Sequence, residues 1–138
     1  MARAVLPRVH MLVICDEIED RWEGDTLHDL LGVRSQLTAP LFPHLCPQLC
    51  IYLQTTAHER TSVCRVVIIR AENDEEIAST SPVEIHFTGP TEFVHLRFWI
   101  ADCKFPAAGV YYSQALFDGK LCCERAFEVF ESEGEADG

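Results

Sequence analysis

The feature that most constrains the fold is a pair of apolar-rich runs, residues 109–117 and 121–130, separated by Asp118-Gly119. An Asp-Gly pair between such runs is a strong short-range signal for a β-hairpin, because both residues tolerate the positive φ of a type I′ turn. A lone hairpin cannot bury both of its faces, so the rest of the chain must supply a sheet and a covering layer. The end of the chain therefore predicts an antiparallel β protein.

Two registers of this hairpin stay open. A two-residue turn places even-numbered residues of the first run opposite the second run, in the pairs Leu116–Leu121, Gln114–Cys123 and Val110–Phe127. A three-residue turn with a glycine bulge brings the other row of the first run into place, namely Tyr111, Ser113 and Ala115. The sequence favours the first register.

Length and composition indicate one globular domain. The chain has 138 residues, of which 48% are hydrophobic and 24% charged, which is enough apolar material for a core without staples. The formal net charge of −11 argues against a nucleic-acid or anionic-membrane surface, since either needs a positive footprint. We expect a soluble protein, and the acidic charge weakly favours a basic partner.

The seven cysteines are best explained as buried thiols of a cytoplasmic protein. The apolar run 9–15 is short for a secretory signal, Pro7 and His10 interrupt its approach, and acids rather than small residues follow Cys15. No segment is long and apolar enough to predict a membrane span. An odd number of cysteines also favours thiols over a disulfide framework.

Alternating apolar and polar residues, with turns every 8–12 residues, predict seven or eight strands and no convincing helix. The expected strands are residues 9–15, 26–38 (bent or bulged at Gly32), 49–54, 61–70, 77–87 (interrupted at Pro82), 92–102, 109–117 and 121–130. The expected connections are an acidic loop at 16–25, a three-proline connector at 39–47, a charged tip at 72–76 with Asn73-Asp74 as its turn, and a turn at Gly89-Pro90.

Two antiparallel sheets packed face to face are the architecture that this pattern favours, because each sheet has one apolar face. The stretch 102–111 is typical of the corner that enters an immunoglobulin-type strand, with Tyr111 as a tyrosine-corner residue. We expect residues 1–8 to be a lead-in, 9–130 a single β-sandwich domain, and 131–138 a disordered acidic tail.

Several short motifs resemble a small bacterial domain family of unknown function, over residues 10–129. They are Leu30-Leu31-Gly32-Val33, Phe42-Pro43, Gly109-Val110-Tyr111 and Asp118-Gly119. The resemblance implies an immunoglobulin-like antiparallel β-sandwich and supplies no activity or site. The acidic tail and the abundant cysteines are departures from the family pattern.

Two groups of residues are weak candidates for metal ligands. His44, Cys46 and Cys50 offer nitrogen and sulfur ligands for Zn²⁺, although their spacing is not that of a zinc knuckle and packing is the favoured role. The acidic loops could supply oxygens to Ca²⁺ if they met at one end of the sandwich, although solvated acidic loops are the commoner meaning. The candidate ligands there are Asp16, Asp20, Asp25, Asp74 and Glu76.

No catalytic or cofactor motif stands out, so we expect no enzyme and no cofactor. His86 and His95 could become neighbours across strands, with a structural role favoured. Trp22, Phe93 and Trp99 could form an exposed aromatic patch that marks an interaction surface. The preferred function is a non-enzymatic protein-interaction module of unknown partner, self-associating into a homo-oligomer; the alternative is a small-ligand or Ca²⁺-binding sandwich with its site at the acidic loops.

Overall fold

The computed structural model describes residues 6–15, 17–20, 28–31 and 35–132, and within these ranges it is built from strands without a helix. In chain order the strands are β1 (Arg8–Cys15), β2 (Glu17–Asp20), β3 (His28–Leu31), β4 (Gln36–Ala39), β5 (His44–Arg70), β6 (Glu75–Ser79), β7 (Val83–Phe105), β8 (Gly109–Phe117) and β9 (Lys120–Glu131). The described part of the chain contains no helix with the length and hydrophobicity needed to cross a membrane.

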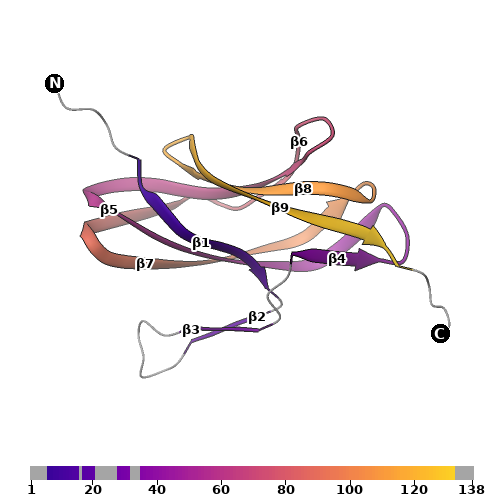
Figure 1. Cartoon of the computed structure of the whole chain (residues 1–138), viewed down its shortest axis with the longest axis horizontal. Coiled ribbons are helices and arrows are strands. Elements are labelled where there is room, and N and C mark those ends of the chain that lie inside the picture. Colours follow the sequence, from indigo (N-terminus) through magenta and orange to yellow (C-terminus); the bar gives the residue numbers. More distant parts are fainter. Residues whose placement is uncertain (1–5, 16, 21–27, 32–34, 133–138) are drawn as a thin grey trace.

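Seven of these strands form one hydrogen-bonded sheet that folds over into two layers. The fold-over occurs where the two long strands, β5 and β7, bend at the left of Figure 1 and pass from one layer to the other. The pairing of β5 with β7 shifts register on both sides of the pair Ala57–Gly89, which marks this bend. The long strands therefore join the two layers.

The first layer consists of β1, residues 44–56 of β5 and residues 94–105 of β7, with β5 in the centre and antiparallel to both neighbours. In the second layer, residues 60–70 of β5 pair with β8 on one side and with β6 and residues 83–87 of β7 on the other. β8 then pairs with β9, and β9 pairs in parallel with the short strand β4. Strands β2 and β3 form a separate two-stranded ladder.

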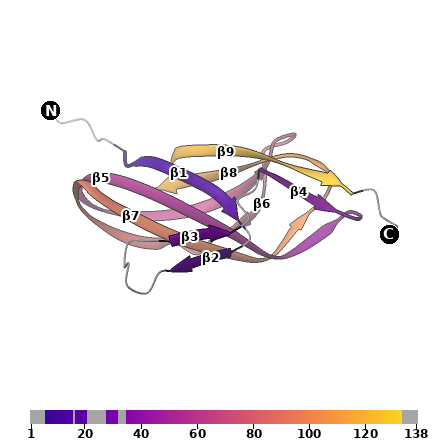
Figure 2. The ribbon, with the colours of Figure 1, turned by 60° about the horizontal axis from the view of Figure 1, so that its bottom comes forward.

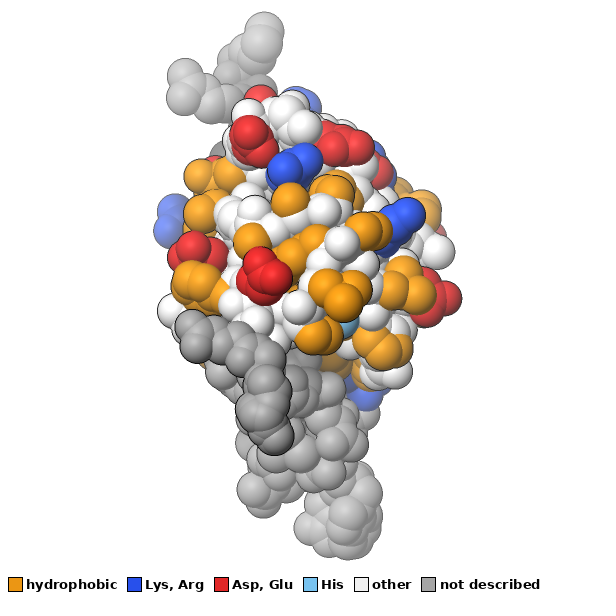
Figure 3. All heavy atoms as spheres, turned by 90° about the vertical axis from the view of Figure 1, so that its right-hand side faces the viewer, with side chains coloured by type: hydrophobic (Ala, Val, Ile, Leu, Met, Phe, Trp, Pro, Cys, Tyr) orange, Lys and Arg blue, Asp and Glu red, His pale blue; other side chains and the backbone are white. Residues whose placement is uncertain are grey.

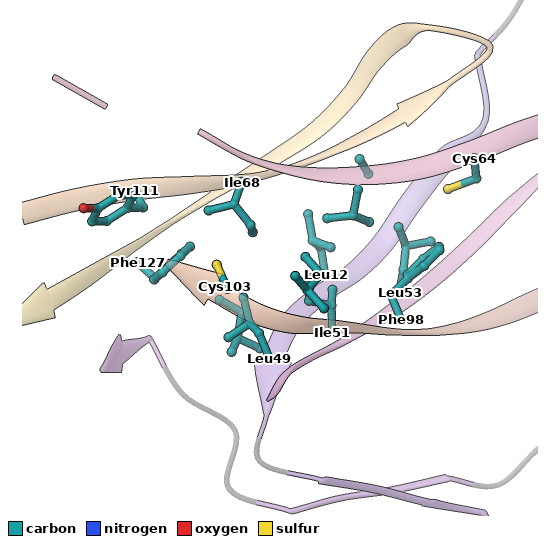
Figure 4. Close-up of a cluster of buried hydrophobic side chains, with 14 of the residues drawn as sticks. Leu12, Leu49, Ile51, Leu53, Cys64, Ile68, Phe98, Cys103, Tyr111 and Phe127 are labelled. Atoms are coloured by element: carbon teal, nitrogen blue, oxygen red, sulfur yellow. The ribbon is translucent and has the colours of Figure 1, made fainter. Parts of the chain in front are cut away.

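The core lies between the layers, as Figure 4 shows. Along β5, the inward residues of the first layer are those predicted from the alternation, Leu49, Ile51 and Leu53. The second layer contributes Cys64, Val66 and Ile68 from β5, together with aromatic side chains. The aromatic rings at one end are Phe105, Tyr111 and Phe127, which pack at centroid distances of 5.0–6.1 Å.

The Asp118-Gly119 hairpin forms with a two-residue turn, in which the two residues have φ of 53° and 80°. The two pairs nearest the turn, Phe117–Lys120 and Leu116–Leu121, follow the favoured register. A register shift between Ala115 and Leu116 then brings the other row opposite β9, in the pairs Ala115–Cys123, Ser113–Arg125 and Tyr111–Phe127. The predicted pairs Gln114–Cys123 and Val110–Phe127 are therefore wrong, because a bulge follows the second pair from the turn.

The hairpin turn is also bonded to β5. The Asp118 carboxylate accepts a hydrogen bond of 2.9 Å from the Val63 backbone N–H, and its other oxygen accepts one of 2.9 Å from Arg60. The Asp118 N–H in turn donates to the Val63 carbonyl at 2.7 Å. The Val63 N–H, helped by Ser62 and Arg60, holds the pKa of the Asp118 carboxyl below its ordinary value. The turn is thus held against the middle of the sheet.

The tyrosine corner is present. The Tyr111 hydroxyl donates a 2.6 Å hydrogen bond to the Ala107 carbonyl, four residues earlier, while the Tyr111 side chain is fully buried. This bond fixes the entry into β8. Together with the two layers and the parallel β4–β9 pair, it identifies the fold as the immunoglobulin-like antiparallel β-sandwich that the sequence predicts.

The N-terminal third differs from the sequence prediction. Residues 17–20 of the predicted acidic loop form β2, which pairs with β3. The strand predicted at 26–38 is two strands, β3 and β4, and its expected bulge at Gly32 lies outside the described residues. The predicted connector at 39–47 is shorter, because residues 44–46 already pair with β7. The prolines do not exclude a strand here, because Pro47 falls at a position of β5 that is not paired with β7. Its missing N–H therefore removes no hydrogen bond from the β5–β7 ladder.

Two predicted connections are bends inside long strands. The Gly89-Pro90 turn is wrong, because β7 continues through these residues and Gly89 pairs with Ala57. Likewise, the strands predicted at 49–54 and 61–70 are parts of the single strand β5. Pro82 does interrupt the ladder as predicted, between β6 and β7. The domain boundaries stay predictions, although β1 begins at Arg8 and β9 ends at Glu131, each one residue outside them.

Candidate interaction surface

A row of four side chains on β7 points away from the core of the first layer: Phe93, His95, Arg97 and Trp99. They share one face because successive strand residues alternate between faces. Phe93 is 51% exposed and Trp99 48% exposed, which is unusual for such large aromatic side chains. Two of the three predicted interaction residues therefore share one face of one strand; the third, Trp22, lies outside the described residues.

Each member of this β7 row has a described neighbour. The Phe93 ring lies 5.1 Å from the ring of His10 on β1, whose Nε2 is 2.8 Å from the Thr56 hydroxyl. The Tyr52 hydroxyl is hydrogen-bonded to His95 Nδ1. The Arg97 guanidinium lies 5.9 Å from the centre of the Trp99 ring. These contacts hold the row in place along the sheet.

Beside the row, a small apolar cluster is buried on the same outward face. Its members are Cys15, Cys50 and Tyr52, with Val13 packed against them. Their exposed fractions are 4% or less. β2 contacts β5, and Figure 2 shows the β2–β3 ladder beside this layer. The aromatic row thus borders a part of the face that is already covered.

β7 also forms an edge of the first layer. Residues 94–105 pair with β5 on one side, and among the described strands none pairs with them on the other. An edge strand of this length leaves a row of backbone N–H and C=O groups that another strand could pair with. The sequence could not reveal this edge, because a single strand pattern does not state how many neighbours a strand has. The combination of an open edge and exposed aromatic rings is what the structure adds.

A second exposed apolar region lies at the end of the molecule where β4 leads into β5. Figure 3 views this end and shows hydrophobic side chains gathered on it. Leu41 in the connection is 65% exposed, and Leu45 at the start of β5 is 53% exposed. Neither residue belongs to the β7 row, so Leu41 can serve as an exposed control position when the β7 row is mutated.

A shallow cavity of about 310 Å³ lies near the tyrosine corner. Its lining includes Arg70, Glu72, Gly109 and Tyr111. The Arg70 guanidinium is 3.0 Å from a Glu72 carboxylate oxygen, so the charge in the cavity is already balanced. The Tyr111 hydroxyl is bonded to the backbone at the corner. We assign no ligand to this cavity.

The proposed zinc ligands do not converge. Cys46 packs against the core, whereas Cys50, four residues later, belongs to the cluster on the outward face. The faces switch between them at Pro47, opposite Asp102, whose φ of 54° marks the irregularity on β7. His44 shares the side of Cys46. No group of three or more potential metal ligands occurs within the described ranges.

The proposed calcium ligands are only partly visible. Asp16 and Asp25 lie outside the described residues, and Asp20 ends β2. Asp74 ends the four-residue turn 71–74 between β5 and β6, which includes the predicted turn residues Asn73-Asp74, and Glu76 lies in β6. Figures 1 and 2 both place β6 on a different side of the molecule from β2. The described parts of the two acidic segments are therefore not brought together.

The two histidines considered for catalysis are also apart. His86 is opposite Thr61 in the second layer, and its Nδ1 lies 2.8 Å from the Thr61 hydroxyl. His95 belongs to the first layer, on the other side of the bend in β7. Each histidine is thus engaged with a hydroxyl group of a neighbouring strand.

The structure has all seven cysteines as thiols. Cys15, Cys50, Cys64 and Cys103 are buried, and the other three are half-buried. Burial raises the pKa of Cys64 to about 12, and burial together with the neighbouring Cys46 raises that of Cys103 to about 12. These two thiols are therefore protonated at neutral pH. Cys122 and Cys123 are adjacent residues of β9, yet both pack at the edge of the core.

Comparisons with known proteins agree with this fold. The profile of a family described as a family of unknown function (DUF6941) matches residues 10–130. The chain has no significant match among the curated proteins.

Two solved structures are similar to this chain to different degrees. One is the alkylpurine DNA glycosylase AlkC of Pseudomonas fluorescens bound to DNA containing an abasic site analogue, with a TM-score of 0.52 and 10% identity. The match covers 89% of this chain but only 30% of the glycosylase, so the chain spans less than a third of that protein. The other is an immunoglobulin-like protein of Pseudomonas aeruginosa, with a TM-score of 0.37 and 8% identity over 91% of this chain and 97% of that one.

Proposed function

The chain belongs to the DUF6941 family of unknown function, and from that premise we propose that it is a non-enzymatic protein-interaction module that self-associates through β7. The observation that carries this proposal is the open edge of β7 at residues 94–105, flanked by the exposed rings of Phe93 and Trp99. Adding a strand to such an edge supplies backbone hydrogen bonds, while side chains of alternate residues supply specificity.

A second copy of the chain is a suitable partner for this edge, because it presents an identical unpaired strand. Two β7 edges that meet antiparallel across a twofold axis would continue the sheet and bury the same surface on both copies. The net charge of −11 on each copy opposes this contact at low ionic strength, and salt screens that repulsion. Self-association through β7 should therefore strengthen as salt is added.

The glycosylase is bound to DNA, and nucleic acid is not the ligand that we propose here. Ten per cent identity supports only a shared fold, and an anionic chain of this charge would be repelled by phosphates. We further propose that the protein works in a reducing compartment such as the cytoplasm. The seven thiols, four of them buried, support that location.

Sedimentation velocity over a range of concentrations and salt tests the proposal. The wild type should form a dimer, and the dissociation constant should rise at least tenfold in Trp99→Lys, which places a charge on the contact. Leu41→Lys is the matched control, because Leu41 is more exposed and lies in the connection between β4 and β5, outside the paired strands. A wild type that stays monomeric to about 100 μM at all salt concentrations, or a Leu41 variant that weakens the dimer as much, would contradict it.

A further inference from the structure

Four of the seven cysteines stand in two directly opposed cross-strand pairs. Cys46 of β5 faces Cys103 of β7, and Cys50 of β5 faces Cys15 of β1. Directly opposed residues on antiparallel strands have Cα atoms roughly 4.5–5.5 Å apart and point to the same face of the sheet. Disulfides span Cα distances of roughly 4.4–6.8 Å. Both pairs therefore fit the backbone separation that a disulfide requires.

The two pairs differ in how an oxidant can reach them. Cys15 and Cys50 are 3% and 1% exposed, beneath the part of the chain that covers the outward face. In the other pair, Cys103 is 1% exposed and lies in the core drawn in Figure 4, but Cys46 is only half-buried. Cys46 is thus the member of the four through which oxidation can begin.

We propose that Cys46 and Cys103 form a reversible disulfide when the protein meets a peroxide. The Cys46 thiolate attacks one peroxide oxygen, the O–O bond breaks, and Cys46 becomes a sulfenic acid while hydroxide leaves. The Cys103 thiolate then attacks the Cys46 sulfur, forming the S–S bond and releasing the second oxygen. The two thiol protons combine with the two released hydroxides, so two thiols and one peroxide give one disulfide and two water molecules.

The resting state of this pair is the dithiol. The Cys46 thiol donates to the Gln48 carbonyl at 3.5 Å, and its pKa is raised by burial, as is that of Cys103. Both groups are therefore protonated at neutral pH and react slowly, which protects them under reducing conditions. Because Cys46 is only half-buried, a reductant can reach the disulfide and reduce it again.

The disulfide would fasten the start of β5 to the last residues of β7, at one end of the open edge. It would close a long loop containing residues 47–102, and long loops gain most from a cross-link because the unfolded chain loses more freedom. The oxidised protein should therefore melt roughly 5–10 °C higher than the reduced one. Reduction with dithiothreitol should reverse this shift.

Peptide mapping of the full chain tests the proposal directly. The protein is treated with hydrogen peroxide, alkylated with iodoacetamide and digested with trypsin without reductant. Cleavage after arginine and lysine places Cys103 alone in peptide 98–104, Cys15 alone in 9–21, and both Cys46 and Cys50 in 35–60. We expect a linked species of 35–60 with 98–104 to form first, as the alkylatable thiols fall from seven to five. Fragmentation of the linked species assigns the bond to Cys46.

Variants sharpen the result. Cys46→Ser should abolish both the linked species and the rise in melting temperature, whereas Cys123→Ser, at another half-buried cysteine, should retain both. The wild-type map needs no variant, so poor folding of Cys46→Ser would leave the test intact. First linkage of 9–21 with 35–60, covalent dimers on a non-reducing gel, or loss of thiols with no linked peptide would each overturn the proposal.

Discussion

The two layers of the sandwich share β5 and β7 but differ in the length of the strands at their edges. The second layer ends in short segments. On one side it ends in the four-residue β4 beside β9, and on the other in the five-residue β6 and residues 83–87 of β7 beside β5. The first layer ends in long ones, the eight-residue β1 and residues 94–105 of β7. Short edge strands offer little to a foreign strand, whereas long ones offer a template. The comparison shows that the first layer leaves a longer unpaired strand edge than the second among the described strands.

The largest loss of stability is expected in the core, where substitutions can show whether the two layers unfold as one cooperative unit. Ile51 in the first layer and Ile68 in the second are both fully buried residues of β5. Replacing either by alanine should lower the free energy of unfolding by about 2–5 kcal/mol, because each change leaves a cavity in the same core. Urea titrations should give one transition with the same m-value for both variants. Two separate transitions in either variant would show that the layers unfold independently.

The hairpin that extends the second layer supplies the next test. Gly119→Val should cost about 1–3 kcal/mol, because a β-branched residue is strained at the φ of 80° found there. No atom lies within 4 Å of a Cβ at this position, so the cost would be conformational rather than a clash. Thermal and urea unfolding measure it, and Lys120→Val on the adjoining strand residue is the control. Equal losses in the two variants would mean that the turn conformation is not what matters.

Alkaline pH should probe a buried thiol in each layer. Cys64 belongs to the second layer and Cys103 to the first, and the pKa of each is about 12 in the folded protein against 9.0 for an ordinary thiol. The unfolded chain loses these protons first, so stability is complete below pH 9 and declines as the pH rises toward 12. At pH 10 each thiol should cost about 1.4 kcal/mol relative to pH 8.

Urea titrations in reductant, comparing Cys64→Ala and Cys103→Ala with the wild type, separate the two contributions. Each variant should lose about 1.4 kcal/mol of the pH-dependent change between pH 8 and pH 10. The rest of the change comes from the other thiols and tyrosines whose pKa is raised by burial. If neither variant reduces the alkaline loss, these thiols are not its source.

The smallest effect is expected at the last residues of β9. Ala39 of β4 pairs with Glu131, and its carbonyl accepts a 2.8 Å hydrogen bond from the Ser132 N–H. A chain that ends at Ser132 should be as stable as the full chain within about 0.5 kcal/mol, while one that ends at Phe130 should lose about 0.5–1.5 kcal/mol. Thermal melts of the two truncations provide the measurement. Equal melting temperatures would show that the parallel β4–β9 contact contributes nothing.

How far the sequence predicts this structure depends on whether a feature is local. The alternation of Leu49, Ile51 and Leu53 and the Asp118-Gly119 turn are local, so they could be predicted. The bulge beside Ala115 and the face switch at Pro47 each depend on the partner strand, which the pattern of a single strand does not identify. Proline and glycine mark irregular backbone, but they do not state whether the chain reverses or only bends.

The features of the candidate surface also divide into local ones, which the sequence predicts, and ones that depend on strand pairing, which it does not. Phe93 and Trp99 were recognisable as aromatic residues on one side of a strand, and their exposure agrees with that interpretation. The open edge of β7 is a property of the topology, and the opposed cysteine pairs are a property of the register. Neither could be derived from the spacing of residues along the chain.

The bend that β5 and β7 share at Ala57 and Gly89 also sets the mechanics of the domain. Because both strands run unbroken through it, no flexible linker separates the two layers. A partner seated on one outer face and another seated on the opposite face would be held at a constant spacing and angle. In an assembly the domain would therefore act as a rigid spacer, transmitting orientation from one bound protein to the next.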